Sequence, residues 1–135
     1  MQAIPVNWWA VIVAALIRMA VGTLWYSPVA FGPRWQLLSG VTQEKWTANM
    51  PMAIATDGIM SLIMAFALAS IVGASGISDL LNGGLAGFWV WLGFMMPVMV
   101  GLWAHESRSA ELVAIMSGFN LVALLLMGAL LGVWR

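Results

Sequence analysis

The sequence predicts an all-α integral membrane protein, a bundle of four transmembrane helices with one short interfacial helix after the first. Of its 135 residues 63% are hydrophobic and 7% are charged, and the mean hydropathy is +0.98. Four apolar stretches match the length of about 20 residues that a helix needs to cross a bilayer. We expect a single domain over residues 1–135, with spans at 6–27, 51–73, 80–103 and 110–134 and an interfacial loop at 28–50.

The first span is bounded by aromatic pairs and carries one charge near its middle. Trp8 and Trp9 lie near its start, and Trp25 and Tyr26 near its end, which is typical of the aromatic belts at the two membrane surfaces. Arg18 lies between them, and an arginine at the centre of a membrane helix costs roughly 2.5 to 3.5 kcal/mol on insertion scales. The sequence therefore predicts that Arg18 faces protein or water and has a partner on another helix.

Residues 28–50 are too polar and too interrupted to span a membrane. Gly32 and Pro33 favour the start of a short helix, because proline suits a first helical turn, and Ser39 and Gly40 favour its end. Thr42 has a side chain that can cap the next helical turn. We expect the short helix to lie in the membrane interface.

The second span has one charge, Asp57, on a face of small residues. That face is formed by Ala53, Asp57, Ser61, Ala65, Ala69 and Gly73. Counted from the loop side at about 1.5 Å per residue, Asp57 and Arg18 reach similar depths. We predict an ion pair between them, with Asn120, Ser61 or Thr23 completing its hydrogen bonds.

The third and fourth spans carry helix-modifying residues. The third is rich in glycine and contains Pro97, which predicts a kink. The fourth contains Asn120, which favours a hydrogen bond between helices. Gly128 and Gly132 are spaced as in close-packed membrane helix pairs, so we expect them to offer a face for assembly.

Basic residues give an orientation. Arg34, Lys45 and Arg108 lie in loops 28–50 and 104–109, against Arg135 on the side of the termini. By the positive-inside rule both loops are cytoplasmic and both termini lie outside.

A set of aromatic, glycine and polar residues along the chain is shared with a known family. The set is Asn7-Trp8, Gly22 to Pro28, Phe31-Gly32, Trp35, Gly40, Gly93-Phe94, Glu106 to Arg108, Asn120 and Gly128. On these residues the chain resembles a bacterial family of small four-helix integral membrane proteins of unknown function, domain of unknown function 1761. The resemblance implies four transmembrane helices in a bacterial inner membrane and no assigned activity.

Three groups of residues are candidate functional sites. The intramembrane polar cluster comprises Arg18, Asp57, Asn120 and Ser61. It fits an ion or proton relay, and it also fits a static pair that fixes helix register. We favour the static pair, because a single pair gives little support for a pathway.

The interfacial motif comprises Trp25, Tyr26, Ser27, Pro28, Phe31, Gly32, Arg34 and Trp35. It suits binding of a lipid headgroup or a partner protein, or a rigid turn. The loop group comprises His105, Glu106 and Arg108, and a lone histidine there is typical of a solvated or capping residue.

Composition excludes several function classes. The chain has no cysteine, so thiolate metal sites and cysteine nucleophiles are excluded, and its net charge of +0 gives no reason to expect nucleic acid as a partner. No nucleophile with a base, metal constellation or phosphate loop is visible, so we expect neither an enzyme nor a cofactor. We expect a structural, accessory or oligomer-forming membrane subunit, with membrane lipids and a second copy or a larger complex as partners. The alternatives are a small oligomeric transporter or channel that uses Arg18 and Asp57, or a lipid-binding protein.

Overall fold

The computed structural model describes residues 4–135, and these residues are organised into helices joined by short connections. Their bounds are α1 (Trp8–Trp25), α2 (Gly32–Ser39), α3 (Gln43–Ala74), α4 (Leu80–Val90), a π-helical turn (Trp91–Met95), α5 (Met96–Glu106) and α6 (Ala110–Val133). Four helical units in this part of the chain are long and apolar enough to cross a membrane: α1, α3, α4 together with α5, and α6. The predicted all-α bundle is therefore confirmed.

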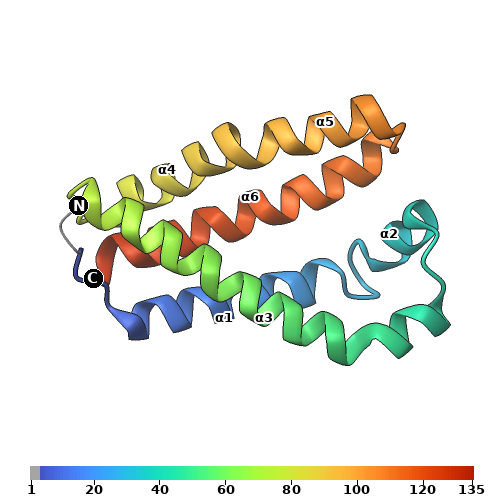
Figure 1. Cartoon of the computed structure of the whole chain (residues 1–135), viewed down its shortest axis with the longest axis horizontal. Coiled ribbons are helices and arrows are strands. Elements are labelled where there is room, and N and C mark those ends of the chain that lie inside the picture. The colour runs from blue at the N-terminus through green and yellow to red at the C-terminus, as the bar shows by residue number, and fades with distance from the viewer. Residues whose placement is uncertain (1–3) are drawn as a thin grey trace.

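The helices run back and forth along one axis (Figure 1). The continuous unit of α4 and α5 lies beside α6, while α1 and α3 form the other part of the bundle. The start of α1 and the end of α6 lie at one end of the molecule, which we call the terminal end, and α2 and the α5–α6 connection lie at the other, the loop end (Figure 1). The predicted short helix is present as α2, and it ends as predicted at Gly40, which has φ 74°.

Each spanning helix starts at a polar side chain that accepts hydrogen bonds from the free N–H groups of its first turn. Such caps matter in a membrane, because lipid offers these groups no partner. The capping residues are Asn7 on α1, Thr42 on α3, Asp79 on α4 and Ser109 on α6. Thr42 therefore caps as predicted, and the helix that follows continues without a break into the membrane span.

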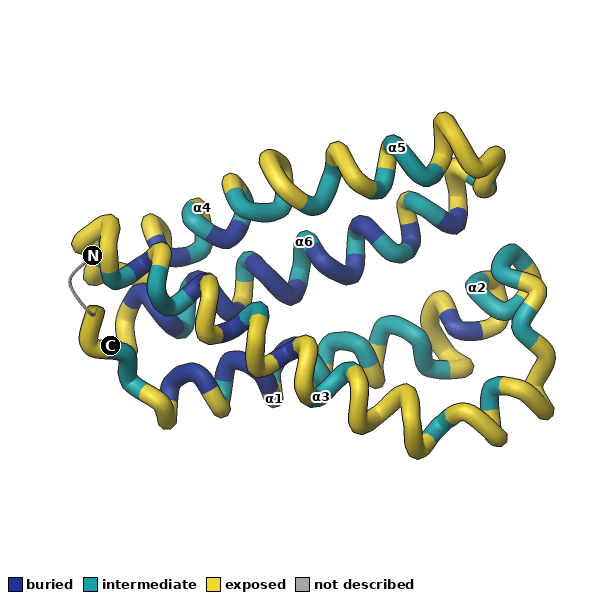
Figure 2. Tube along the Cα trace, viewed as in Figure 1, coloured by how far each residue is buried: buried dark blue, intermediate teal, exposed yellow. Residues whose placement is uncertain are grey.

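Helix α6 forms the centre of the bundle (Figure 2). Half of its most apolar window is buried inside the protein, against 28% for α1, 17% for α3 and 6% for α4 and α5 together. Small side chains on α1, such as Ala10 and Ala14, pack into this core, together with Leu124 and Met127 of α6. The outward-facing apolar side chains of the other helices are those that lipid would contact.

Helices α4 and α6 meet at a seam of glycines. A Cβ atom on Gly83 would lie 2.2 Å from the carbonyl oxygen of Gly128, and one on Gly132 would lie 2.3 Å from that of Asp79. Backbone therefore touches backbone, which only glycine permits. The expectation that Gly128 and Gly132 offer a face for assembly is wrong, since the chain's own α4 occupies that face.

Helix α3 starts at Gln43 and passes through Pro51 before entering its apolar part. Proline removes one helical hydrogen bond, but the cap at Thr42 starts the helix well before it. Residues 51–56 are exposed on every side of the helix (Figure 2). Toward the loop end α3 therefore stands apart from the rest of the bundle.

The irregularity expected at Pro97 takes the form of a π-helical turn just before it. The N–H of Met96 bonds to the carbonyl of Trp91, and Pro97 then opens α5. Proline has no N–H to continue the α-helical ladder, and a widened turn is one way to accommodate this. The indole of Trp91 donates to the carbonyl of Ser117 on α6 at 2.9 Å, which ties the turn to the core.

Candidate functional site

The intramembrane polar cluster is built around the Arg18 guanidinium of α1. Its Nη1 atom donates to Asp57 Oδ1 and to Ser61 Oγ, the latter at 2.9 Å. Asp57 and Ser61 lie four residues apart on α3, so both side chains face the same neighbour. The predicted pair between Arg18 and Asp57 is present, and of the three expected hydrogen-bond partners Ser61 is the one that contacts it.

Helix α6 covers the other side of the guanidinium. The Arg18 Cζ atom lies 5.0 Å from the centre of the Phe119 ring, within the range of a cation–π interaction. Arg18 therefore touches α3 through its charge and α6 through its flat face. The side chain joins three helices, and sequence reasoning missed Phe119 because an aromatic residue in a membrane helix carries no signal of its own.

Two expected partners of the ion pair bond elsewhere. The Asn120 amide donates to the carbonyl of Met116 in its own helix at 3.0 Å, and its Oδ1 atom is buried without a partner among the described residues. The hydroxyl of Thr23 donates to the carbonyl of Met19, also within its helix. Within residues 4–135 the bonded cluster thus comprises Arg18, Asp57 and Ser61, and of the three alternative partners Asn120 and Thr23 do not bond to the pair.

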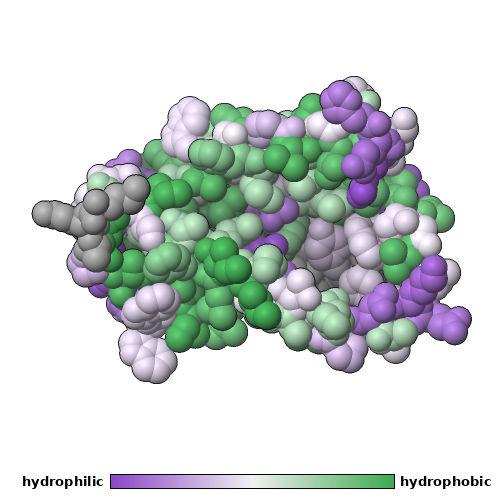
Figure 3. All heavy atoms as spheres, viewed as in Figure 1, coloured by the Kyte–Doolittle hydropathy of each residue, from purple (hydrophilic) through white to green (hydrophobic). Residues whose placement is uncertain are grey.

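The two charges differ in exposure. The Arg18 side chain is 11% exposed, whereas that of Asp57 is 41% exposed. The space-filling view shows hydrophilic atoms at the loop end and also within a recess of the apolar surface (Figure 3). Because α3 stands apart there, one face of the Asp57 carboxylate is uncovered at a depth where the surrounding surface is apolar.

The interfacial motif forms a compact turn after α1. The Trp25 indole donates to the carbonyl of Ile115 at 3.0 Å, and its ring contacts Phe31 at 4.8 Å between centres. The Ser27 hydroxyl donates to the carbonyl of Leu24 at 2.7 Å. A Cβ atom on Gly32 would lie 2.3 Å from the carbonyl oxygen of Tyr26, so the chain folds back tightly there. Much of the motif therefore has a structural role.

A bidentate ion pair attaches α2 to α6. Nε and Nη2 of Arg34 donate to the two carboxylate oxygens of Glu111 at 2.5 and 2.6 Å. The hydrogen bond and the charge of Glu111 raise the pKa of Arg34 above its ordinary value, so the guanidinium stays charged. Arg34 is thus engaged with its own chain.

Three aromatic rings line a pocket of about 200 Å³ at the loop end. Trp35 meets Tyr26 edge to face at 5.9 Å and Trp46 at 5.1 Å, with interplanar angles of 70° and 63°. Pro28 and Gly32 also line it. Trp46 lies outside the predicted motif. The sequence could have indicated it, because it is one more tryptophan in the interfacial segment.

The aromatic rings continue from this pocket toward the intramembrane cluster. Tyr26 meets Phe119 edge to face at 5.5 Å between ring centres, and Phe119 covers the Arg18 guanidinium. A chain of contacts therefore joins Trp46 at the interface to the ion pair inside the bundle.

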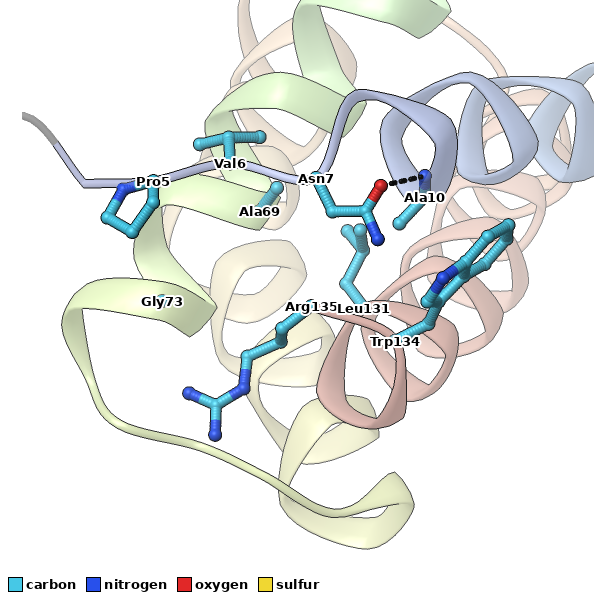
Figure 4. Close-up of a pocket in the computed structure, with 9 residues that line it drawn as sticks. All are labelled: Pro5, Val6, Asn7, Ala10, Ala69, Gly73, Leu131, Trp134 and Arg135. Carbon is cyan, nitrogen blue, oxygen red and sulfur yellow. Dashed lines mark hydrogen bonds between the residues drawn. The ribbon is translucent and has the colours of Figure 1, made fainter.

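The remaining features lie in the α5–α6 connection and at the terminal end. Arg108 donates to Glu106 at 2.8 Å in the α5–α6 connection, and the neighbouring His105 is exposed. No group of three metal-binding side chains occurs within residues 4–135. One pocket at the terminal end, lined by Asn7 and Trp134 among others, holds about 20 Å³, which is room for little more than one water molecule (Figure 4). A wider, open hollow of about 480 Å³ lies beside it and shares Asn7 in its lining.

Comparison with known proteins gives one match. No curated protein and no solved structure matches the chain. The model of one protein family, described as protein of unknown function (DUF1761), matches residues 9–132. This match covers the four spanning units, except for Trp8 and Val133 at their outer ends, and the interfacial segment between the first two. The chain belongs to the DUF1761 family.

Proposed function

We propose that the protein is a non-catalytic structural or accessory subunit of a membrane assembly, and that it binds a further chain through the face of α3 around Asp57. The observation that carries the proposal is the 41% exposure of the Asp57 side chain among apolar surface. Lipid tails cannot solvate a carboxylate, and charged groups within membranes face protein or water. Another protein chain can supply the missing polar contact.

The ion pair itself is better suited to hold helices than to move charge. Arg18 contacts Asp57 and Ser61 on α3 and Phe119 on α6, so its position is fixed from two sides. Buried polar pairs of this kind fix register between packed helices. Ala and Gly residues dominate the nearby helix faces, and they favour close packing over a polar path.

The surface that we propose for assembly is the stretch of α3 around residues 51–57. Residues 51–56 contact little of the bundle, whereas the glycines of α6 are already covered by α4. Ala53 lies one turn before Asp57 and is exposed, so a second helix can approach closely there. We propose a second copy or a larger complex as the occupant, in a bacterial inner membrane.

Cysteine cross-linking in native membranes tests this proposal. The chain has no cysteine, so Ala53→Cys introduces a single reactive site on the proposed face. We expect a bifunctional thiol reagent to join Ala53→Cys to a second copy or to another protein. Val98→Cys on the exposed surface of α5 is the matched control and should give far less product. Equal yields from both sites, or none from Ala53→Cys, contradict the proposal.

Substitution of the ion pair separates assembly from transport. A buried pair that loses one partner costs about 3–5 kcal/mol, and the exposure of Asp57 reduces this, so we expect Asp57→Asn to lower the free energy of unfolding by about 1–3 kcal/mol. Native mass spectrometry from mild detergent should show Arg18→Ala with fewer subunits. If the variants keep both their stability and their subunit number, the ion pair has no structural role.

The second candidate is an oligomeric transporter or channel, which the exposed Asp57 carboxylate and the aromatic contacts from Trp46 to Arg18 favour. It requires that Arg18→Ala assemble normally and lose solute flux in liposomes.

The basic residues Arg34, Lys45 and Arg108 support an orientation with the loop end in the cytoplasm. A compartment-sensitive reporter fused to the C-terminus tests it, and activity of a cytoplasm-only reporter contradicts it.

A further inference from the structure

We propose that the pocket bounded by Tyr26, Trp35 and Trp46, called here the aromatic pocket, binds a quaternary ammonium group. This inference does not depend on assembly through residues 51–57 of α3, since the pocket is lined by the start of that helix, at Gln43 and Trp46.

The walls of the aromatic pocket have the geometry that a weakly hydrated cation requires. The Trp35 ring stands at 70° to Tyr26 and at 63° to Trp46, so the three rings form a corner and not a flat stack. A cation in such a corner can contact more than one ring, and cation–π attraction is strongest for tryptophan. The volume of about 200 Å³ gives room for a small organic group.

The polar side chains of the aromatic pocket are uncharged. Gln36 and Gln43 line it, and the Gln36 amide donates to the Gln43 carbonyl oxygen at 2.8 Å, which holds α2 against α3. Among residues 4–135, no charged side chain lines this pocket. A strongly hydrated ion or an anion would lose its water shell there without a charged partner, whereas a methylated ammonium, which is weakly hydrated, loses less.

The two arginines near these elements are already paired, and Glu44 and Lys45, which lie between Gln43 and Trp46 on α3, do not line the pocket. Arg34 on α2 bonds to Glu111, and Arg18 behind Phe119 bonds to Asp57. The guanidinium groups are therefore neutralised and repel a bound cation only weakly. The aromatic faces supply the attraction that remains.

The aromatic pocket lies at the loop end, where we expect the membrane surface. Tyr26 follows the last residue of α1, and α2 and the start of α3 form the loop end (Figure 1). Tryptophan and tyrosine occupy this level because one side of each ring system is apolar and the other is polar. A quaternary ammonium can reach the pocket as a lipid headgroup or as a free solute, and both sources offer the same chemistry.

Fluorine NMR of protein labelled with 5-fluorotryptophan tests the proposal. The nine tryptophans give separate signals, which single substitutions assign. In a non-ionic detergent, choline chloride should shift the Trp35 and Trp46 signals to saturation. The neutral isostere 3,3-dimethyl-1-butanol and equal sodium chloride should leave them unchanged. An equal response to the neutral isostere overturns the proposal, because the pocket would then select apolar shape alone; so does the absence of any response.

Ring substitutions locate the effect. Trp46→Leu, followed through the Trp35 signal, should raise the dissociation constant for choline about 2- to 30-fold, and Trp46→Phe should raise it less. Trp89→Leu on α4 is the matched control, since Trp89 is exposed and lies outside the aromatic pocket. Unchanged affinity in folded Trp46→Leu overturns the assignment. Circular dichroism establishes that each variant is folded.

Nanodiscs distinguish the two sources. If the ammonium comes from a headgroup, the Trp35 and Trp46 signals in phosphatidylcholine discs should already match the saturated state, and added choline should change nothing. If it comes from a free solute, these signals should respond to choline in phosphatidylcholine and phosphatidylglycerol discs alike. Signals that respond to neither lipid nor choline overturn the proposal.

Discussion

Replacement of Gly87 by alanine tests the glycine seam between α4 and α6, on which the position of the third span depends. A Cβ atom at this position would lie 2.0 Å from the carbonyl oxygen of Leu124 and 2.6 Å from its carbonyl carbon. Both are backbone atoms, which cannot rotate away as a side chain can. Ordinary contact begins at 3.4 Å, so the helices must separate locally by about 1.4 Å.

The expected magnitude follows from two opposing effects. Overpacking of a well-packed interior costs about 1–3 kcal/mol, and close helix contact is a main source of attraction between membrane helices. Alanine regains about 0.5–1 kcal/mol of helix propensity over glycine. Because the separation also weakens the neighbouring contacts of Gly83 with Gly128, we expect Gly87→Ala to lower the free energy of unfolding by about 1–3 kcal/mol.

Gly84 provides the matched control on the same helix. A Cβ atom there would meet its nearest neighbour, the carbonyl oxygen of Leu125, at an ordinary 3.6 Å. Gly84→Ala should therefore be neutral or stabilising by up to about 1 kcal/mol. Unfolding in mixed micelles with increasing dodecyl sulfate, followed by circular dichroism, gives both values. If the two variants unfold alike, backbone contact at Gly87 does not hold the seam, and the reasoning fails.

Three further substitutions test single interactions. Trp91→Phe leaves a smaller aromatic ring but removes the indole bond to Ser117, and loss of that bond should lower the free energy of unfolding by about 0.5–1.5 kcal/mol in the same micelle assay. Gly40→Ala forces a side chain into the left-handed region at φ 74° and should cost about 1 kcal/mol, measured as faster proteolysis between α2 and α3. Hydrogen bonds from Asn82 hold the pKa of Asp79 below its ordinary value, so the cap is intact above about pH 4 and is lost as pH falls through the folded-state pKa. Asp79→Asn should make the free energy of unfolding depend less on pH between pH 6 and pH 3. If this pH dependence is the same in the variant, the cap does not contribute to it.

Local chemistry made the helix ends predictable. Gly40 supplies the left-handed residue that ends α2, and Thr42 supplies the oxygen that starts α3. The pair of Arg18 and Asp57 was predictable for a different reason, because a charge in an apolar span needs a partner at equal depth and the chain offers few. These inferences use only spacing and the physics of the membrane.

The predictions that failed concern the choice between equivalent partners. The spacing of Gly128 and Gly132 indicates close approach of a helix, but it does not identify the helix, and α4 of the same chain takes the place. Asn120 lies at a suitable depth for the ion pair, yet its amide reaches a carbonyl of its own helix. Rotamers and helix rotation decide both cases, and neither follows from residue spacing.

The aromatic pocket was beyond prediction for a topological reason. Tyr26, Trp35 and Trp46 belong to the end of α1, to α2 and to α3, and they meet only because the chain turns back at Gly32. A tryptophan at a membrane surface needs no ligand to explain it, so each ring taken alone indicates only an interface. Their mutual angles are what indicate a site.

The position of α6 connects the structural and the candidate functional parts of the molecule. One side of this helix packs through Gly128 against α4, while Phe119, farther toward the loop end, covers Arg18. Phe119 also contacts Tyr26, a wall of the aromatic pocket. The seam thus sets where α6 lies, and α6 in turn supports both the ion pair and this pocket. Tight backbone contact thus fixes α6 against α4 on one side, and the side chains of α6 on its other side hold the polar cluster and one wall of the pocket in place.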